Sequence, residues 1–145
     1  MNANAETQSL SLVYDLAHPP AKVWRALTEP ELLAKWVMAN DMKPSVGHAF
    51  TFRLEPTAWW DGIVNCEVLE SDPPRRLRYS WRGGPESSQV DTVVTWTLTP
   101  TSSGGTKLAL EQTGFRPENK FAFDGANQGW QYMLGQRLPE VLAKL

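Results

Sequence analysis

The stretch that decides the fold is PPAKVWRALTEPELLAKW, residues 19–36. Pro20 stands where the first turn of a helix tolerates proline, and the next residues form one apolar face. The residue before Pro30 avoids the α region, so the first helix ends there and a second begins. We therefore predict two short helices, over 20–27 and 30–36.

A longer helical stretch closes the chain. Apolar residues recur at helical spacing between Asn127 and Leu145, which predicts a helix over 126–144 with its N-cap near Asp124 or Asn127. Pro139 falls inside the pattern and should kink or restart that helix, because proline lacks a backbone N–H.

The segments between these helices alternate polar and apolar residues and are separated by turn residues. One buried face and one solvated face are typical of antiparallel strands. We predict an α+β fold, in which a long helix lies along a curved antiparallel sheet, from six strands over 9–16, 48–54, 59–71, 75–82, 89–100 and 105–113.

Length and charge exclude several functional classes. The 145 residues fit one domain, 1–145, in which we expect 1–8 to be disordered. Fourteen basic and 16 acidic residues create no field that would attract nucleic acid or an anionic membrane. No apolar run spans a bilayer, no signal peptide is visible, and the lone Cys66 with two histidines forms no disulfide or metal pattern. We expect a cytoplasmic protein without metal or cofactor.

Aromatic residues are the unusual part of the composition. Seven tryptophans are consistent with a roomy interior or an interface, although each of them can equally fill the core. Residues 114–125 are predicted to be a loop carrying Phe115, Phe121 and Phe123. These rings either cap a cavity mouth or dock on the core.

In order and spacing, a series of short motifs resembles the proteins related to the activator of the heat-shock-protein-90 ATPase, in the START-like (SRPBCC) superfamily. They are residues 19–36, Val46-Gly47 with Phe50, residues 68–77, Tyr79 with Trp81, residues 94–98, residues 105–115, and Gly129-Trp130 with Leu134. The resemblance implies a helix-grip fold: one strand, two helices, five more antiparallel strands and a C-terminal helix held by the sheet.

The resemblance implies function less tightly, since such relatives include a chaperone ATPase activator, resistance proteins, cyclase-like enzymes and simple binders. Two departures matter. We expect no counterpart of the N-terminal domain that anchors the chaperone activator, and Gln112 stands where many relatives carry a histidine.

The leading hypothesis is binding of an apolar or aromatic small molecule between the sheet and the C-terminal helix. Tyr79 and Gln112 would orient the ligand, or else be core residues satisfied by their neighbours. The predicted wall comprises Trp36, Phe52, Trp60, Val64, Tyr79, Trp81, Trp96, Gln112, Phe115, Trp130, Met133 and Leu134.

Two other functional classes stay open. A protein-interaction module, with a chaperone or a second copy as partner, would use the outer sheet face at Thr95, Thr97, Lys107 and Glu111. An enzyme would be cyclase-like, with Tyr79 and Gln112 polarising a carbonyl. The remaining polar candidates favour binding over catalysis: His18 and His48 are predicted at the surface, Cys66 as a small buried hydrophobe and Asp61 as a turn residue.

Overall fold

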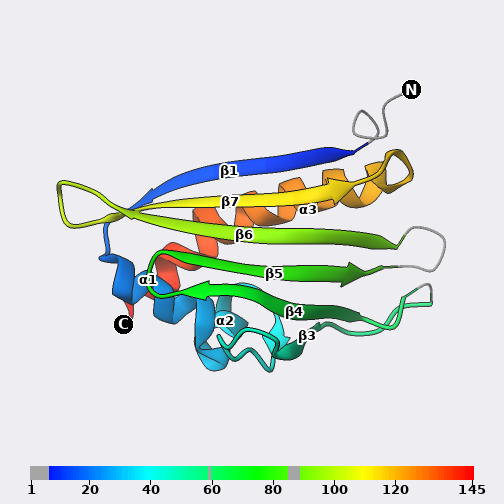
Figure 1. Cartoon of the computed structure of the whole chain (residues 1–145), viewed down its shortest axis with the longest axis horizontal. Coiled ribbons are helices and arrows are strands. Elements are labelled where there is room, and N and C mark those ends of the chain that lie inside the picture. Colours follow the sequence, from blue (N-terminus) through cyan, green and yellow to red (C-terminus); the bar gives the residue numbers. More distant parts are fainter. Residues whose placement is uncertain (1–6, 59, 85–88) are drawn as a thin grey trace.

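The computed structural model describes residues 7–58, 60–84 and 89–145, and it forms one antiparallel sheet with helices on one face (Figure 1). The predicted disorder of 1–8 falls mostly on residues outside this description, as do the first residue of the predicted strand 59–71 and residues 85–88. The strands are β1 (Gln8–Leu16), β2 (Ala39–Asn40), β3 (Ala49–Arg53), β4 (Ile63–Asp72), β5 (Arg76–Gly83), β6 (Val90–Pro100) and β7 (Thr106–Phe115).

The sheet runs in the order β1-β7-β6-β5-β4-β3-β2 and all its pairs are antiparallel. The α+β prediction is confirmed, but the count of six strands is wrong because β2 adds a seventh. This strand has two residues, too short for any alternation to mark it. Its pairing with β3 depends on Asn40, whose side-chain amide donates to the backbone oxygens of Pro30 and Met38.

Strand β4 begins four residues later than predicted. Asp61 accepts a hydrogen bond from the backbone N–H of Ile63 at 3.0 Å, which makes Asp61 the turn residue that its place before Gly62 predicts. Trp60 therefore precedes the strand and lies in the connection that leads into it.

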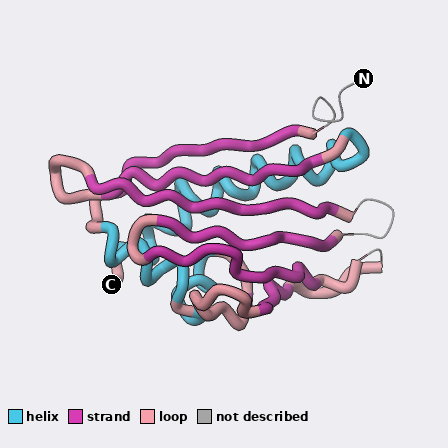
Figure 2. Tube along the Cα trace, in the orientation of Figure 1, coloured by secondary structure: helices cyan, strands magenta, loops and turns pink. Residues whose placement is uncertain are grey.

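Two helical groups cover the inner face of the sheet (Figure 2). The first is α1 (Pro20–Thr28) with α2 (Pro30–Trp36), as predicted. The second is the C-terminal group: the 3-10 turn η3 (Pro117–Asn119), α3 (Lys120–Tyr132), the π-helical turn η4 (Met133–Arg137) and α4 (Leu138–Ala143).

The C-terminal helix begins at Lys120, so the predicted start at 126 and the predicted loop over 114–125 are both wrong. The buried Asn119 explains the earlier start. Its carbonyl oxygen accepts from the backbone N–H of Arg116, and its amide donates to the backbone oxygen of Gln89 at the start of β6. This tertiary bond anchors the first turn, which local spacing did not reveal.

Pro139 restarts the helix, as predicted. It stands in the first turn of α4, and the wider π-helical turn η4 precedes it. A π turn shifts the hydrogen-bond pattern by one residue, so the missing N–H of Pro139 is accommodated without breaking the helical path.

A bulge at Gly114 decides where the end of β7 points. The β1–β7 register jumps from Ser9↔Thr113 to Gln8↔Phe115, and Gly114 has a φ of +105°. In a regular strand Phe115 would share the outer face of Thr113. The extra residue turns Phe115 onto the inner face instead, where it is buried.

The core is held together by aromatic rings that meet across the layers. Trp96 of β6 packs edge-to-face against Trp36 of α2 and Trp130 of α3, at centroid distances of 5.9 and 5.4 Å. Trp130 and Phe52 both contact Trp81, at 5.5 and 5.2 Å. The C-terminal helix therefore packs on the sheet, as the helix-grip arrangement requires. Within the described ranges, no helix is long and apolar enough to span a membrane.

Replacing Gly114 by alanine should destabilise the protein more than the same change at Gly104. Both residues have positive φ, which costs a non-glycine residue about 1–2 kcal/mol. A Cβ at Gly114 would lie 3.0 Å from the backbone oxygen of Asp91, whereas one at Gly104 would meet nothing within 4 Å. Urea unfolding of both variants measures the difference, and equal losses would contradict the packing role of the bulge.

Candidate functional site

An apolar pocket of about 220 Å³ opens at the end of the sheet where β5 and β7 end and β4 and β6 begin. The first two turns of α3 form its other side, at the right-hand end of the molecule in Figure 1. The lining residues are Met38, Trp60, Val64, Trp81, Gly83, Gly84, Val90, Gln112, Phe115, Ala122 and Ala126.

The structure divides the predicted wall into two groups. Five of its residues line the pocket: Trp60, Val64, Trp81, Gln112 and Phe115. The others lie in the packed core beside it or, in the case of Met133, half-buried against it: Trp36, Phe52, Tyr79, Trp96, Trp130, Met133 and Leu134.

Sequence reasoning missed six lining residues. Ala122 and Ala126 stand one helical turn apart, but they fell in or beside the segment predicted to be a loop. Gly83 and Gly84 fall between the predicted strands 75–82 and 89–100, and at Met38 and Val90 no pattern distinguished a pocket residue from a core residue. An i, i+4 pair of small residues on α3 is the signal that a correct helix start would have exposed.

Tyr79 is a core residue. Its side chain is 1% exposed, and its hydroxyl accepts a hydrogen bond of 3.0 Å from the indole N–H of Trp96. Burial raises the pKa of Tyr79, so the phenol stays protonated. Of the two polar residues proposed to orient a ligand, Tyr79 lies in the packed core and not among the residues that line the pocket.

Gln112 lines the pocket and is held by a directed chain of hydrogen bonds. Its carbonyl oxygen accepts from the indole N–H of Trp130 at 2.9 Å, and its amide donates to the hydroxyl of Thr92 at 2.9 Å. The Thr92 hydroxyl donates in turn to the backbone oxygen of Trp81 at 3.0 Å.

The two ends of this chain determine its direction. An indole N–H can only donate and a backbone carbonyl can only accept, so Oε1 of Gln112 faces Trp130 and Nε2 faces Thr92. The carboxamide, 1% exposed, therefore presents a defined orientation to the pocket.

Aromatic side chains form much of the pocket wall. Trp60 reaches it from the loop before β4, where its indole N–H donates to the backbone oxygen of Ile63 at 3.3 Å. Phe115 is supported from behind by Phe123 of α3, in an edge-to-face contact at 5.2 Å. Three phenylalanines were predicted to share a loop. Phe115 lines the pocket, Phe123 packs against the Phe115 ring, and Phe121 is 92% exposed.

The other titratable candidates lie away from the pocket. His18 accepts a hydrogen bond from the Lys22 ammonium at 3.0 Å, and burial together with that charge lowers the pKa of His18. A ring nitrogen of His48 lies 3.0 Å from the backbone oxygen of Asp41. Cys66 is buried in the core, and this burial raises the pKa of its thiol. Over the described part of the chain, no three His, Cys, Asp or Glu side chains form a metal site.

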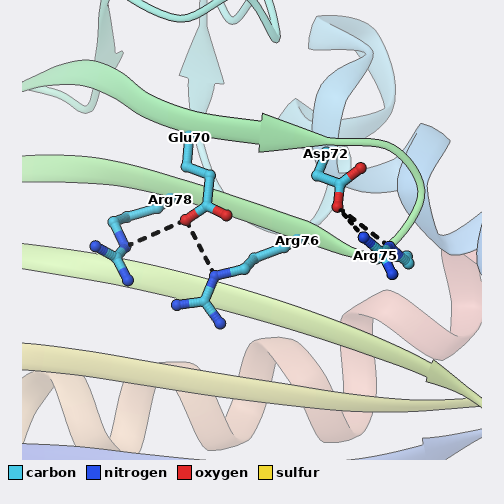
Figure 3. A network of polar contacts seen from close by, with 5 residues as sticks. All are labelled: Glu70, Asp72, Arg75, Arg76 and Arg78. Atoms are coloured by element: carbon cyan, nitrogen blue, oxygen red, sulfur yellow. Dashed lines mark hydrogen bonds and ion pairs between the residues drawn. The ribbon is translucent and has the colours of Figure 1, made fainter.

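The outer sheet face is polar and carries charges of both signs. A bulge in β4 breaks the register between Val68 and Glu70, and Glu70 lies 3.1 Å from Arg76 and 3.9 Å from Arg78 (Figure 3). Such exposed ion pairs contribute little to stability. Thr95 and Thr97 are half-buried here and Lys107 and Glu111 exposed, so these residues form no apolar docking patch.

Comparison with known proteins identifies a matching family and several solved structures with a similar fold. A family model described as Activator of Hsp90 ATPase homolog 1-like protein matches residues 17–143. The crystal structure of protein MLL2253 from Mesorhizobium loti is 40% identical, with a TM-score of 0.85 over 94% of this chain and 98% of that one. No curated protein matches significantly.

Two further solved structures share the fold. Protein CV1439 from Chromobacterium violaceum is 27% identical, with a TM-score of 0.72 over 92% of this chain and 96% of that one. CalU16 from Micromonospora echinospora is 23% identical, with a TM-score of 0.73 over 94% of this chain and 76% of that one.

Replacing Thr92 by valine should cost about 1–3 kcal/mol of unfolding free energy, because the Gln112 amide and the Trp81 carbonyl each lose a buried partner while the shape is preserved. Thr95→Val makes the same change on the outer face of the same strand and should stay within about 0.5 kcal/mol of the parent. Chemical denaturation measures both, and a neutral Thr92→Val would refute the hydrogen-bond chain.

Tyr79→Phe should cost about 1–3 kcal/mol near neutral pH, because the indole N–H of Trp96 loses its acceptor. The folded-state pKa is raised, so the wild type loses this part of its stability as pH rises above the unfolded value of about 10. The difference in unfolding free energy between the wild type and the Tyr79→Phe variant should therefore decrease between about pH 8 and pH 11. Urea unfolding at both pH values tests this, with the exposed Tyr132→Phe as control; a constant gap would contradict it.

Proposed function

The chain belongs to the family of Activator of Hsp90 ATPase homolog 1-like proteins, and from this premise we propose that it binds a small aromatic or apolar molecule reversibly in the pocket beneath α3. The fold of this family supports a small ligand-binding domain. We infer the location of the binding site from the pocket, and the class of ligand from the chemistry of the residues that line it.

The observation that carries the proposal is the composition of the lining. Among the described lining residues, eight have apolar or aromatic side chains, two are glycine, and Gln112 is the one amide. An apolar wall with a single orienting polar group is typical of small-molecule sites. Binding would release water from this wall, at about 25 cal/mol for each Å² of apolar surface removed from solvent.

The size of the pocket limits the ligand. A protein cavity of about 150 Å³ accommodates benzene, so a volume of about 220 Å³ suits one or two rings. Trp60, Trp81 and Phe115 offer ring faces and edges against which a flat molecule can pack. A bulky or long-chain ligand would need the wall to move.

Binding is a better description than catalysis for this wall. Within residues 7–58, 60–84 and 89–145, the lining contains no His, Cys, Asp, Glu, Lys or Tyr side chain that could move a proton near neutral pH. The cyclase-like alternative required Tyr79 beside Gln112, and the Tyr79 hydroxyl is already bonded to Trp96 in the core. The protein-interaction alternative would depend on the outer sheet face, which is polar and of mixed charge.

Filling the pocket should abolish binding of a two-ring probe without unfolding the protein. Naphthalene at about 100 times its dissociation constant should raise the unfolding free energy of the wild type by about 2.7 kcal/mol. Ala126→Leu places three more carbon atoms in the pocket and should weaken naphthalene binding at least tenfold. Calorimetric titration and thermal unfolding in the presence of the probe measure both effects.

The matched control is Gln128→Leu, which adds a leucine to an exposed position of the same helix. It should bind naphthalene as the wild type does. Absence of binding to the wild type, or equal binding by the Ala126→Leu variant, would overturn the proposed function.

A further inference from the structure

Gln112 is buried, lines the pocket and has hydrogen-bonding capacity that the described residues do not use. A primary amide carries two N–H donors and a carbonyl oxygen with two lone pairs. One donor is taken by Thr92 and one lone pair by Trp130. Among residues 7–58, 60–84 and 89–145, the second N–H and the second lone pair have no partner.

The unused donor is more informative than the unused lone pair. Carbonyl oxygens in protein interiors often use one lone pair only. Removing a polar N–H from water is costly where no acceptor replaces the water. The described part of the wall offers this N–H no strong side-chain acceptor, because the other lining side chains are apolar, a thioether or indoles, which only donate. An acceptor atom on the ligand would complete the set.

Charge narrows the ligand class further. Among the residues that the structure describes, none that lines the pocket carries a charge, so an anionic ligand would be buried against an apolar wall without a counter-ion. Burying an unpaired ion is far more costly than burying a hydrogen-bonded neutral group. A carboxylate or phosphate ligand is therefore disfavoured, although its oxygens are good acceptors.

From these features we propose that the pocket is selective for an uncharged aromatic molecule whose carbonyl oxygen accepts a hydrogen bond from Nε2 of Gln112. This inference rests on the proposed binding function and adds the chemical class of the ligand. Thr92 and Trp130 act as positioning residues, because their bonds hold the amide so that its nitrogen end and its oxygen end cannot exchange.

Three naphthalene derivatives of similar shape separate the contributions of the aromatic rings, the carbonyl group and a negative charge to binding. They are 2-acetylnaphthalene, with a carbonyl; 2-ethylnaphthalene, without one; and 2-naphthoate, an anion at neutral pH. A net hydrogen bond in a buried site predicts that the wild type binds the ketone about three- to tenfold more tightly than the hydrocarbon. The carboxylate should bind at least tenfold more weakly than the ketone. Calorimetric titration of the intact chain measures all three dissociation constants.

Two variants assign the selectivity to the amide. Gln112→Leu removes both the donor and the acceptor, and it should bring the ketone-to-hydrocarbon affinity ratio close to one while the hydrocarbon still binds. Thr92→Val removes one of the two groups that position the amide but leaves the bond from Trp130 and both Nε2 donors, so it should keep a ratio above one. Thr95→Val, on the outer face of the same strand, should keep the wild-type ratio. A general loss of stability would lower both affinities together and leave their ratio unchanged.

The outcomes distinguish the two proposals. If the wild type binds ketone and hydrocarbon equally, or prefers the carboxylate, the pocket still binds aromatic molecules and the inference about carbonyl selectivity is overturned. If none of the three probes binds, both the proposed binding function and the inference about carbonyl selectivity are overturned. A ketone preference that survives Gln112→Leu would also overturn the role assigned to Gln112.

Discussion

The packing of Trp130 against the sheet is the interaction on which the rest of the structure depends. Its ring lies against Trp96 and Trp81, and its indole N–H is bonded to Gln112 of β7. One side chain therefore joins the C-terminal helix to three strands by both apolar and polar contacts. Because the bond to Gln112 requires a particular rotation of the helix, it also sets which residues of α3 face the sheet.

That attachment separates a packed core from an open pocket. On one side of Trp130 the rings of Trp36, Trp96, Tyr79 and Phe52 fill the space between the layers, and the one phenol among them is satisfied by a neighbouring indole. On the other side α3 presents Ala122 and Ala126, whose small side chains leave the space unfilled. The same hydrogen-bond chain that anchors the helix thus orients the amide at the pocket wall.

Two local irregularities give the pocket its shape. The Gly114 bulge turns Phe115 inward, and Asn119 fixes the first turn of the C-terminal group to the backbone of Gln89. Both lie where β7 passes into the helix, the segment of the chain in which periodicity was the poorest guide. Irregular backbone next to a cavity is a common way for a sheet to re-aim a side chain.

The sequence by itself determined the class of fold and the two short helices after strand one, since these follow from periodicity, proline positions and an ordered set of family motifs. It also indicated an aromatic interior and the restart at Pro139. Only the tertiary structure shows which predicted wall residues line a pocket: Trp60, Val64, Trp81, Gln112 and Phe115. Tyr79 and Trp96 are instead hydrogen-bonded to each other in the core. Alternation assigns a residue to a face of the sheet, but it cannot say how far along that face the covering helix lies or where its side chains are small. Those two quantities depend on contacts between residues distant in the chain, such as Trp130 with Gln112, and they separate an open pocket from a packed core.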